Sequence, residues 1–298
     1  MKRILYFGPE GSYTQKAMNK AISLLDLSDY SPEAVLRIND IISEVEESED
    51  CIGVIPIENS IEGPVNLTVD SLVHDFDLKI CGEIIIPISH NLLVNPGTSL
   101  DEVKDVYSHS QALNQCRYFI QDHDMLAHYT LSTAEAARKV SESGKGGAIG
   151  NLKAAELYGL EVLASNIQET SNNQTRFIIV SKEDFDESED NSYCCSASKV
   201  SDCCCGDIES DEEYKTSIAF SLFEDNPGGL YNILGIFAKY NINLNKIESR
   251  PSREGLGKYI FFIDFEYNKN NKEIPSILDN LKSETSFFKH LGSYPKFK

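Results

Sequence analysis

The sequence predicts an α/β fold for about the first 181 residues and a smaller α+β unit at the C-terminal end. Along the first stretch, short runs rich in β-branched and apolar residues alternate with helical patterns, which is typical of α/β proteins with largely parallel sheets. The last stretch has the order β-α-β-β-α-β within roughly 80 residues, the arrangement of a ferredoxin-like unit. Between them, residues 183–213 lack apolar periodicity and predict a mobile linker or insertion.

The predicted elements place helix starts directly after strand ends. In the first stretch we expect strands at 3–7, 51–57, 84–94, 105–108, 147–149 and 176–180, and helices at 14–25, 110–120, 134–141 and 152–158. In the C-terminal unit we expect strands at 216–223, 243–249, 258–266 and 290–294, and helices at 229–239 and 274–282. Residues suited to N-capping open the first set of helices, namely Ser12 or Thr14, Ser110, Thr133 and Asn151. Because helix N-termini beyond strand ends offer free N–H groups, this pattern favours a small organic acid as ligand.

Charge and hydropathy exclude several classes of partner. The net charge of -20 argues against nucleic acid and anionic membranes, because both require a basic face. Residues 182–213 hold twelve acidic residues and two lysines, and so supply -10, half of this charge. No run approaches a membrane span, and the apolar stretch 4–7 is too short for a secretory signal, so we expect a cytoplasmic protein.

The eight cysteines do not form a disulfide framework, which indicates a reducing compartment. Three of them, Cys51, Cys81 and Cys116, are isolated in the sequence. The others crowd into the acidic segment as Cys194, Cys195, Cys203, Cys204 and Cys205. Adjacent cysteines diverge, no Cys-x-x-Cys pair occurs, and no apolar shell surrounds them, so we expect a dispensable insertion; a metal or redox site is the alternative.

Four stretches of the first domain combine turn residues with uncharged polar side chains. They are Gly-Pro-Glu-Gly-Ser-Tyr-Thr at 8–14, Pro-Ile-Glu-Asn-Ser-Ile-Glu-Gly-Pro-Val at 56–65, Ser-His-Ser-Gln-Ala at 108–112 and Asn-Gln-Thr-Arg-Phe at 173–177. Taken singly, each is also an ordinary turn, helix cap or strand. Taken together and in this order, they resemble the prephenate dehydratase family over nearly the whole chain except the acidic segment.

The C-terminal unit carries an independent match. Asn-Pro-Gly-Gly-Leu-Tyr at 226–231 and Glu-Ser-Arg-Pro at 248–251 resemble the ACT regulatory domains fused to these enzymes. Two departures from the family pattern are visible. Ser110 stands where the family has proline, which loosens that turn, and Gly229 and Tyr231 replace the second and fourth residues of a Gly-Ala-Leu-Val motif, which leaves effector affinity open.

The resemblance implies a definite organisation of the chain. Residues 1–182 would form a catalytic domain with the two-lobed fold of type II periplasmic binding proteins, residues 183–213 the acidic linker or insertion, and residues 214–298 the ACT domain. One lobe would contain about 1–78 and 162–181, and the other about 79–161. The substrate would lie between the lobes, whose closure excludes water.

The resemblance also implies a cofactor-free conversion of prephenate to phenylpyruvate. Loss of carbon dioxide and of the ring hydroxyl makes the substrate ring aromatic, so the enzyme must hold, orient and polarise it. We find neither a zinc-like Cys/His spacing nor a glycine-rich nucleotide loop, and expect no metal or organic cofactor. By resemblance, Thr175 is the catalytic residue and polarises the C–O bond of the departing hydroxyl. A plain strand role for Thr175 is the alternative.

Hydroxyls, amides and one guanidinium suit a substrate with two carboxylates, and Arg176 is the strongest electrostatic candidate. The alternative for Arg176 is a surface ion pair. The expected substrate-binding residues are Thr14, Asn59, Ser60, Gly63, Ser108, Gln111, Gln115, Thr133, Arg176 and Phe177.

Other ionisable residues near the motifs have supporting roles in this prediction. Glu58, Glu62 and Glu135 would lie behind the residues that touch the substrate, because carboxylates repel an anion. His109 is expected as a hydrogen-bonded structural group, and proton donation by it is the alternative.

The ACT resemblance implies that phenylalanine binds between ACT domains of a homo-oligomer, a dimer or a tetramer, and regulates the enzyme. The expected effector-binding residues are Pro227, Gly228, Gly229, Leu230, Tyr231, Glu248, Ser249, Arg250 and Pro251. A helix cap and a strand end are the alternative for these segments. Two other functions stay open, namely dehydration of arogenate, and small-acid sensing without catalysis.

Overall fold

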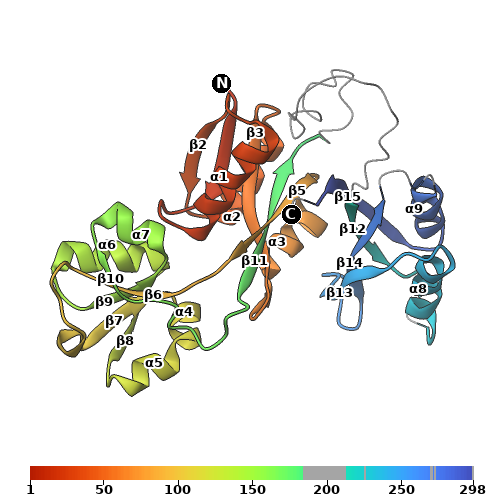
Figure 1. Ribbon diagram of the computed structural model, residues 1–298. Coiled ribbons are helices and arrows are strands. Elements are labelled where there is room, and N and C mark those ends of the chain that lie inside the picture. Colours follow the sequence, from red (N-terminus) through yellow and green to blue (C-terminus); the bar gives the residue numbers. More distant parts are fainter. Residues whose placement is uncertain (184–212, 225, 269–270, 272, 297–298) are drawn as a thin grey trace, which may run out of the picture.

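The computed structural model describes residues 1–183, 213–224, 226–268, 271 and 273–296, and these form three sheets arranged in a row (Figure 1). The middle sheet has the order β2-β1-β3-β11-β5, with β4 paired to β3. Its strands are β1 Arg3–Phe7, β2 Ser31–Val35, β3 Cys51–Asn59, β4 Gly63–Pro64, β5 Lys79–Pro87 and β11 Gln174–Ser181. Helix α1 (Tyr13–Leu25) packs on one face, and α2 (Ile38–Glu47) and α3 (Asn66–Asp70) pack on the other. This sheet and its helices form the first lobe.

The second lobe lies at the end of the row away from the C-terminal domain (Figure 1). Its sheet has the order β10-β6-β9-β7-β8. The strands are β6 Asn91–Val94, β7 Asp105–Ser108, β8 Leu126–Tyr129, β9 Gly147–Gly150 and β10 Glu161–Ala164. One face carries α4 (Ser110–Gln115) and α5 (Arg117–Asp122), and the other carries α6 (Thr133–Ser143) and α7 (Leu152–Tyr158).

The chain crosses from the first lobe to the second between β5 and β6, and returns between β10 and β11. Two lobes joined by two crossings confirm the predicted fold class. The chain enters the second sheet only after Pro87, later than the predicted boundary near residue 79, because β5 pairs with β11 in the first sheet. Both sheets are mixed rather than largely parallel. The outgoing strands β5 and β6 run antiparallel to the returning strands β11 and β10, which a chain that crosses and comes back requires.

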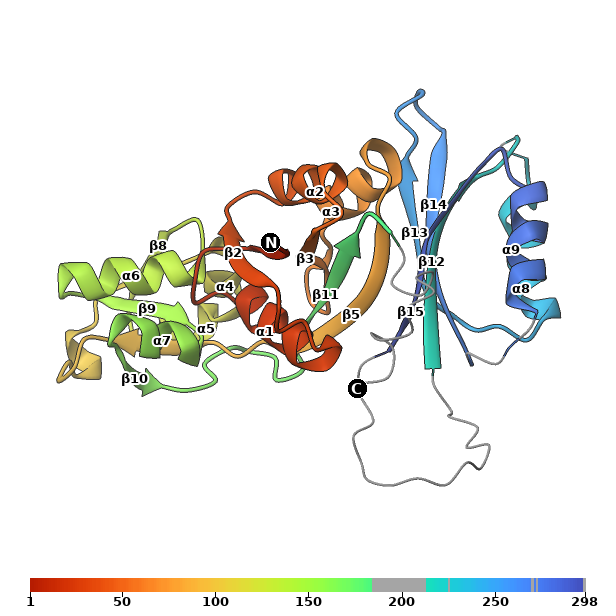
Figure 2. The same ribbon diagram turned by 90° about the horizontal axis from the view of Figure 1, so that it is seen from above.

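The C-terminal domain has the predicted order β-α-β-β-α-β. Its elements are β12 Glu213–Ser221, α8 Gly229–Lys239, β13 Leu244–Pro251, β14 Tyr259–Asn268, α9 Ile274–Ser283 and β15 Phe287–Pro295. Helices α8 and α9 cover one face of the sheet β13-β14-β12-β15, and the other face packs on the first lobe (Figure 2). There Phe262, Leu291 and Tyr294 join the apolar core that contains Ile178 and Val180. The two domains therefore share a core.

Local sequence signals explain most helix starts. The side chain of Ser12 accepts a bond from the amide of Gln15 and caps α1, and Asn151 caps α7 in the same way through Ala154. The predicted caps Ser110 and Thr133 are one residue late, since His109 and Ser132 cap α4 and α6. No helix of the described residues is long and apolar enough to cross a membrane.

Candidate active site

A chain of hydrogen-bonded side chains links the two lobes, and we call it the polar chain. Asn59, at the end of β3, donates from Nδ2 to the Thr175 hydroxyl at 2.9 Å and to Asn173 Oδ1 at 2.8 Å. Asn173 donates to Gln115 Oε1 at 2.7 Å, and Nε2 of His90 lies 3.0 Å from the same oxygen. Thr175 is half-buried and the other members are buried. The polar chain thus connects β3 and β11 of the first lobe to the end of α4 in the second.

The backbone fixes the direction in which the Asn59 carboxamide faces. Its Oδ1 accepts bonds from the amides of Ile61 and Glu62, both at 3.0 Å. Nδ2 must therefore be the group that donates to Thr175, whose oxygen accepts. Because the Thr175 hydroxyl makes no other hydrogen bond to a described residue, its own proton is available to a ligand.

The position of Gln115 determines the protonation of His90. A carboxamide oxygen only accepts, so Nε2 of His90 carries the proton that faces Gln115 Oε1, and Nδ1 is bare. Burial lowers the pKa of His90 despite the bond to Gln115, so the imidazole is neutral. Nδ1 of His90 and Nε2 of Gln115 are buried with no partner among the described residues. These two atoms leave the polar chain open to a ligand or to water.

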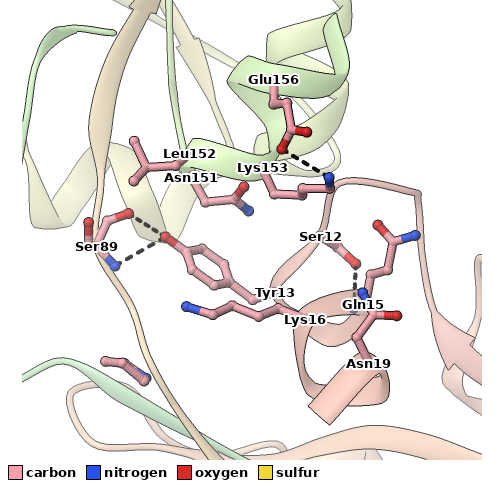
Figure 3. A pocket seen from close by; sticks show the side chains of 11 residues that line it. Ser12, Tyr13, Gln15, Lys16, Asn19, Ser89, Asn151, Leu152, Lys153 and Glu156 are labelled. Atoms are coloured by element: carbon pink, nitrogen blue, oxygen red, sulfur yellow. Dashed lines mark hydrogen bonds and ion pairs between the residues drawn. The ribbon is translucent and has the colours of Figure 1, made fainter. Parts of the chain in front are cut away.

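A pocket of about 350 Å³ lies where the lobes meet, and we call it the hinge pocket (Figure 3). It is lined by Ser12, Tyr13, Gln15, Lys16, Asn19, Pro87, Ser89, Asn151, Leu152, Lys153 and Glu156. Tyr13 connects it to the polar chain, because its hydroxyl donates to the carbonyl and accepts from the amide of Ser89 while its ring meets that of His90 edge-on at 6.3 Å. None of the predicted substrate-binding residues lines this pocket.

The lobes touch directly at Gly11. Nδ2 of Asn151 donates to the carbonyl oxygen of Gly11 at 2.8 Å. A Cβ at Gly11 would lie 3.3 Å from the side chain of Leu157, and the backbone there has a φ of +82°, so both space and conformation favour glycine. The glycine-rich stretch 8–14 therefore serves the contact between the lobes.

The hydroxyls of Ser108 and Ser60 hold the surroundings of the site together, and their contact with a substrate stays a prediction. The fully buried Ser108 hydroxyl donates to the carbonyl oxygen of Ile149 at 2.6 Å. Ser60 donates to the carbonyl of Asn172 at 3.1 Å and accepts from the amide of Gln174 at 2.9 Å. Both predicted substrate contacts thus correspond to bonds between elements.

The remaining polar candidates lie around the polar chain without joining it. Thr14 is buried in the first turn of α1, Gln111 is in the first turn of α4, and Thr133 is the first residue of α6. Gly63 pairs with Asn59 and has a φ of +81° with open space around it. Contact of these four residues with a substrate stays a prediction.

The structure places the side chains of Arg176 and Phe177 outside the polar chain. Successive side chains of a strand point to opposite faces, so Arg176 leaves the face of Thr175 and points to the C-terminal domain. There its guanidinium pairs with Asp264 and Glu83. Phe177 returns to the face of Thr175, but it lies one step deeper, is 2% exposed, and belongs to the apolar core under α1. Contact of either side chain with a substrate stays a prediction.

Two of the three carboxylates near the motifs have identifiable partners among the described residues. Glu58 faces the C-terminal domain, where Lys246 Nζ lies 3.3 Å away. Glu135 accepts from the amide of Leu131 at 2.7 Å, next to the N-terminus of α6. Glu62 is exposed. His109 accepts a bond from the amide of Gln111 at 3.3 Å, which agrees with its predicted structural role.

The predicted effector residues divide between two faces of the C-terminal sheet. The start of α8 exposes Pro227, Gly228 and Tyr231, and its first turn also contains Gly229 and Leu230. Glu248 and Arg250 point the other way, toward the catalytic domain, where Arg250 makes a bidentate pair with Asp70 at 2.7 Å. Ser249 and Pro251 are exposed. Within one chain, the Arg250 guanidinium therefore lies in the contact between domains.

Sequence reasoning missed Asn173, His90 and Tyr13. Asn173 carried a usable signal, since it lies two residues before Thr175 and an extended chain directs both to one face. His90 interrupts the apolar run 84–94, which is a weaker signal. Cys194, Cys195, Cys203, Cys204 and Cys205 lie outside the described residues. Within the described residues, no three His, Cys, Asp or Glu side chains are grouped as a metal site requires.

The family model for prephenate dehydratase matches residues 4–185, and the model for the ACT domain matches residues 216–284. The chain belongs to the prephenate dehydratase family. Its C-terminal domain is an ACT domain. The chain is therefore a dehydratase of aromatic amino acid biosynthesis, an enzyme of the carbon–oxygen lyase class.

Individual relatives agree with this assignment. A protein named prephenate dehydratase from Methanocaldococcus jannaschii is 42% identical, and the match covers 99% of both chains. A protein of Arabidopsis thaliana named arogenate dehydratase/prephenate dehydratase 1, chloroplastic, is 38% identical over 81% of this chain and 60% of its own length. The solved structure of prephenate dehydratase from Arthrobacter aurescens in complex with L-Phe is 30% identical with a TM-score of 0.79, and the match covers 98% of this chain and 89% of that one.

Proposed function

We propose that this chain converts prephenate to phenylpyruvate without a cofactor, in phenylalanine biosynthesis, and that Thr175 acts on the departing hydroxyl. One observation carries the proposal. The Thr175 oxygen accepts a bond from Asn59, whose direction is fixed by two backbone amides, so the Thr175 proton is available to an incoming ligand. A preorganised donor aimed at a leaving oxygen is what this reaction requires.

The reaction balances with a hydrogen bond as the main chemical contribution of the protein. The bond between the ring and its carboxylate breaks, carbon dioxide leaves, and the electron pair moves through the ring to expel the hydroxyl at the opposite carbon. The products are the phenylpyruvate anion, carbon dioxide and hydroxide, which becomes water on gaining a proton from solvent. Because threonine is a weak acid, Thr175 stabilises the developing negative charge on oxygen rather than transferring its proton fully.

Neutral donors take the part that the sequence assigned to Arg176. Nε2 of Gln115 is buried and unpartnered among the described residues, and it can donate to a carboxylate or carbonyl of the substrate. Lys16 of α1 lines the hinge pocket and adds positive potential where the lobes meet, whereas Lys153 of α7 is paired with Glu156 at 2.9 Å in the same lining. This arrangement suits a dianion without a cation in direct contact with Thr175.

Turnover assays on two substrates test the proposal. The purified protein is incubated in chelator with prephenate and then with arogenate, and phenylpyruvate or phenylalanine release is followed. We expect phenylpyruvate from prephenate and little change with chelator. Arogenate is the second candidate substrate, because one relative carries arogenate dehydratase in its name. Faster turnover of arogenate would reassign the substrate, and no turnover of either would refute the proposal.

We further propose that phenylalanine binds between the ACT domains of a cytoplasmic homodimer or tetramer and regulates turnover. The ACT match supports this, as does the relative whose structure was solved with L-Phe. Strand β13 is an edge of the ACT sheet with Ile247 46% exposed, which suits pairing with a second copy. Cys51 and Cys116 are buried thiols that form no disulfide with another described residue, which suits a reducing compartment.

Calorimetry tests the effector site. The exposed turn at the start of α8 offers Tyr231 as a direct contact, whereas Arg250 lies between the domains. We expect Tyr231→Ala to weaken phenylalanine binding more than Arg250→Ala does, and the coupling between effector and substrate to be about 1–3 kcal/mol. If the wild-type protein releases no heat with phenylalanine, the regulatory proposal is wrong.

A further inference from the structure

The two residues at the centre of the polar chain have neighbours in sequence that reach the ACT domain. Thr175 and Asn59 are paired across β11 and β3, and the next pair along the same strands is Arg176 and Glu58. Because side chains alternate along a strand, Arg176 and Glu58 point away from the polar chain and toward the ACT sheet. Thr175 and Asn59 are thus each adjacent in sequence to a residue whose side chain contacts the other domain.

The ACT domain supplies partners for both side chains, in addition to Glu83 of β5, which pairs with Arg176 within the first lobe. Arg176 pairs through Nη1 with Asp264 of β14 and donates from Nη2 to the hydroxyl of Tyr294 at 2.7 Å. Lys246 of β13 lies 3.3 Å from the carboxylate of Glu58. We call these five residues, Arg176, Glu58, Asp264, Tyr294 and Lys246, the interdomain clamp.

Burial makes the clamp specific. Arg176 is 9% exposed, Asp264 and Tyr294 are 0% exposed, and Glu83 beneath them is 2% exposed. A buried guanidinium that loses a partner is costly, so the position of Arg176 depends on the ACT strands as well as on Glu83 of its own lobe. Although burial alone lowers the pKa of Arg176, Tyr294, Asp264 and Glu83 together raise it well above its usual range. The guanidinium of Arg176 therefore stays charged and always requires partners.

The backbone at this point also depends on the side chains. The β11–β3 pairing shifts register between Arg176 and Phe177, immediately after the Arg176–Glu58 pair and one pair away from Thr175 and Asn59. Such an irregularity redirects side chains, and it weakens the ladder that would otherwise fix them. The interdomain clamp therefore holds the backbone next to this irregularity in place.

We infer that Arg176 and Glu58 are positioning residues through which the ACT domain holds Thr175 and Asn59 in their catalytic geometry. The inference rests on the proposed function and deepens it, because it names the contacts through which the ACT domain controls turnover. Movement of β13 and β14 relative to the first lobe would displace Arg176 and Glu58, and with them the bond from Asn59 to Thr175. Sub-ångström displacement of a preorganised donor is enough to slow the chemical step.

Substitutions on the ACT side test the inference without touching the polar chain. Tyr294→Phe removes one hydroxyl from the clamp, Asp264→Asn removes the charge of that carboxylate, and Lys246→Met removes the ACT-domain partner of Glu58. We expect kcat for prephenate to fall about 5- to 50-fold, with KM changed by less than about three-fold, since an interaction needed mainly in the transition state is weakened. Tyr294→Phe is nearly isosteric, so it gives a readout even if Asp264→Asn fails to fold.

The matched control is Arg253→Ala. Arg253 pairs with Asp75 across the same two domains, but this pair is exposed and neither residue adjoins a member of the polar chain in sequence. We expect its kcat to stay within about two-fold of the wild type, as is usual for an exposed ion pair. Equal losses of kcat in Arg253→Ala and the clamp variants would reduce the clamp to general domain packing and overturn the inference.

A spectroscopic readout separates this inference from the proposed function. The side-chain amide of Asn59 donates to Thr175, so its NMR resonance reports that bond without any substrate. We expect this resonance to shift in Tyr294→Phe and to stay in place in Arg253→Ala. An unchanged resonance with unchanged kcat in Tyr294→Phe and Lys246→Met refutes the positioning role. If the wild-type protein does not convert prephenate, the proposed function is refuted. The Asn59 resonance still tests the interdomain clamp in that case.

Discussion

The two faces of strand β11 differ in the charge of the side chains that they carry. On the face of Thr175, the polar chain consists of neutral groups, since even His90 is held in its uncharged form by burial. On the face of Arg176, charged side chains are buried and paired, both within the first lobe and between the two domains. Consecutive residues of one strand therefore serve chemistry and domain coupling.

This difference follows from what each face must do. A neutral chain of donors can meet an anionic substrate without first releasing a counter-ion, and its geometry is set by bonds to backbone amides. Buried ion pairs bind nothing further, but they are intolerant of displacement because an unpaired buried charge is costly. The neutral face is open to a ligand, and the charged face fixes the strand.

The largest expected effect comes from the neutral face. Thr175→Ala removes the donor to the departing hydroxyl, and we expect kcat to fall about 100- to 10,000-fold with little change in KM. Steady-state kinetics with prephenate measures both values. Thr175→Ser keeps a hydroxyl and should retain most of the activity. Near-normal kcat in Thr175→Ala would remove Thr175 from the reaction.

The next effect tests whether the polar chain acts as a unit. Asn173→Ala removes the link between Asn59 and Gln115 and leaves a buried amide oxygen with one donor fewer. We expect a loss of about 1–3 kcal/mol in the free energy of unfolding together with a lower kcat. Denaturant titration and kinetics measure these effects, and the exposed neighbour Asn172→Ala is the control. If Asn173→Ala and Asn172→Ala have the same kcat, the polar chain does not contribute to catalysis.

The contact between domains should be sensitive to a single methyl group. Gly292 of β15 has a φ of +138°, and a Cβ there would clash with the backbone of Ile80 in β5. We expect Gly292→Ala to lower the free energy of unfolding by about 1–3 kcal/mol, because backbone cannot move aside as a side chain can. Denaturant unfolding is the measurement.

Gly235→Ala is the control for this prediction. Gly235 lies inside α8 with open space around its Cα, so alanine should stabilise the protein by about 0.5–1 kcal/mol through helix propensity. A stable Gly292→Ala protein would show that β15 and β5 are not packed as tightly as described.

The smallest expected effect lies in the acidic segment. Replacing residues 184–212, which lie outside the described residues, with a Gly/Ser linker long enough to join the domains should leave kcat and phenylalanine binding within about two-fold. Kinetics, calorimetry and metal analysis of the intact protein form the test. Stoichiometric zinc or iron that is lost together with activity on replacement would contradict a dispensable segment.

The sequence by itself determined the fold class and the family. Strands with strong apolar character, such as β1 and β3, were predicted almost residue for residue, because a buried strand must be apolar wherever it pairs. The edge strands β2, β8 and β10 were missed, since they are largely exposed and their pairing depends on neighbours. Helix α2 was missed despite a readable pattern, with Ile38, Ile41, Ile42 and Val45 on one face.

Only the tertiary structure decided which site residues work together. The motif at 173–177 contained Asn173, Thr175 and Arg176, and residue type alone assigned Arg176 to the substrate. Strand alternation already separates Arg176 from Thr175, but only the packing of the ACT sheet supplied the partners that hold the guanidinium away from the polar chain. The physical reason is that an ion pair depends on distance in space, whereas Asp264 lies 88 residues from Arg176 in the sequence.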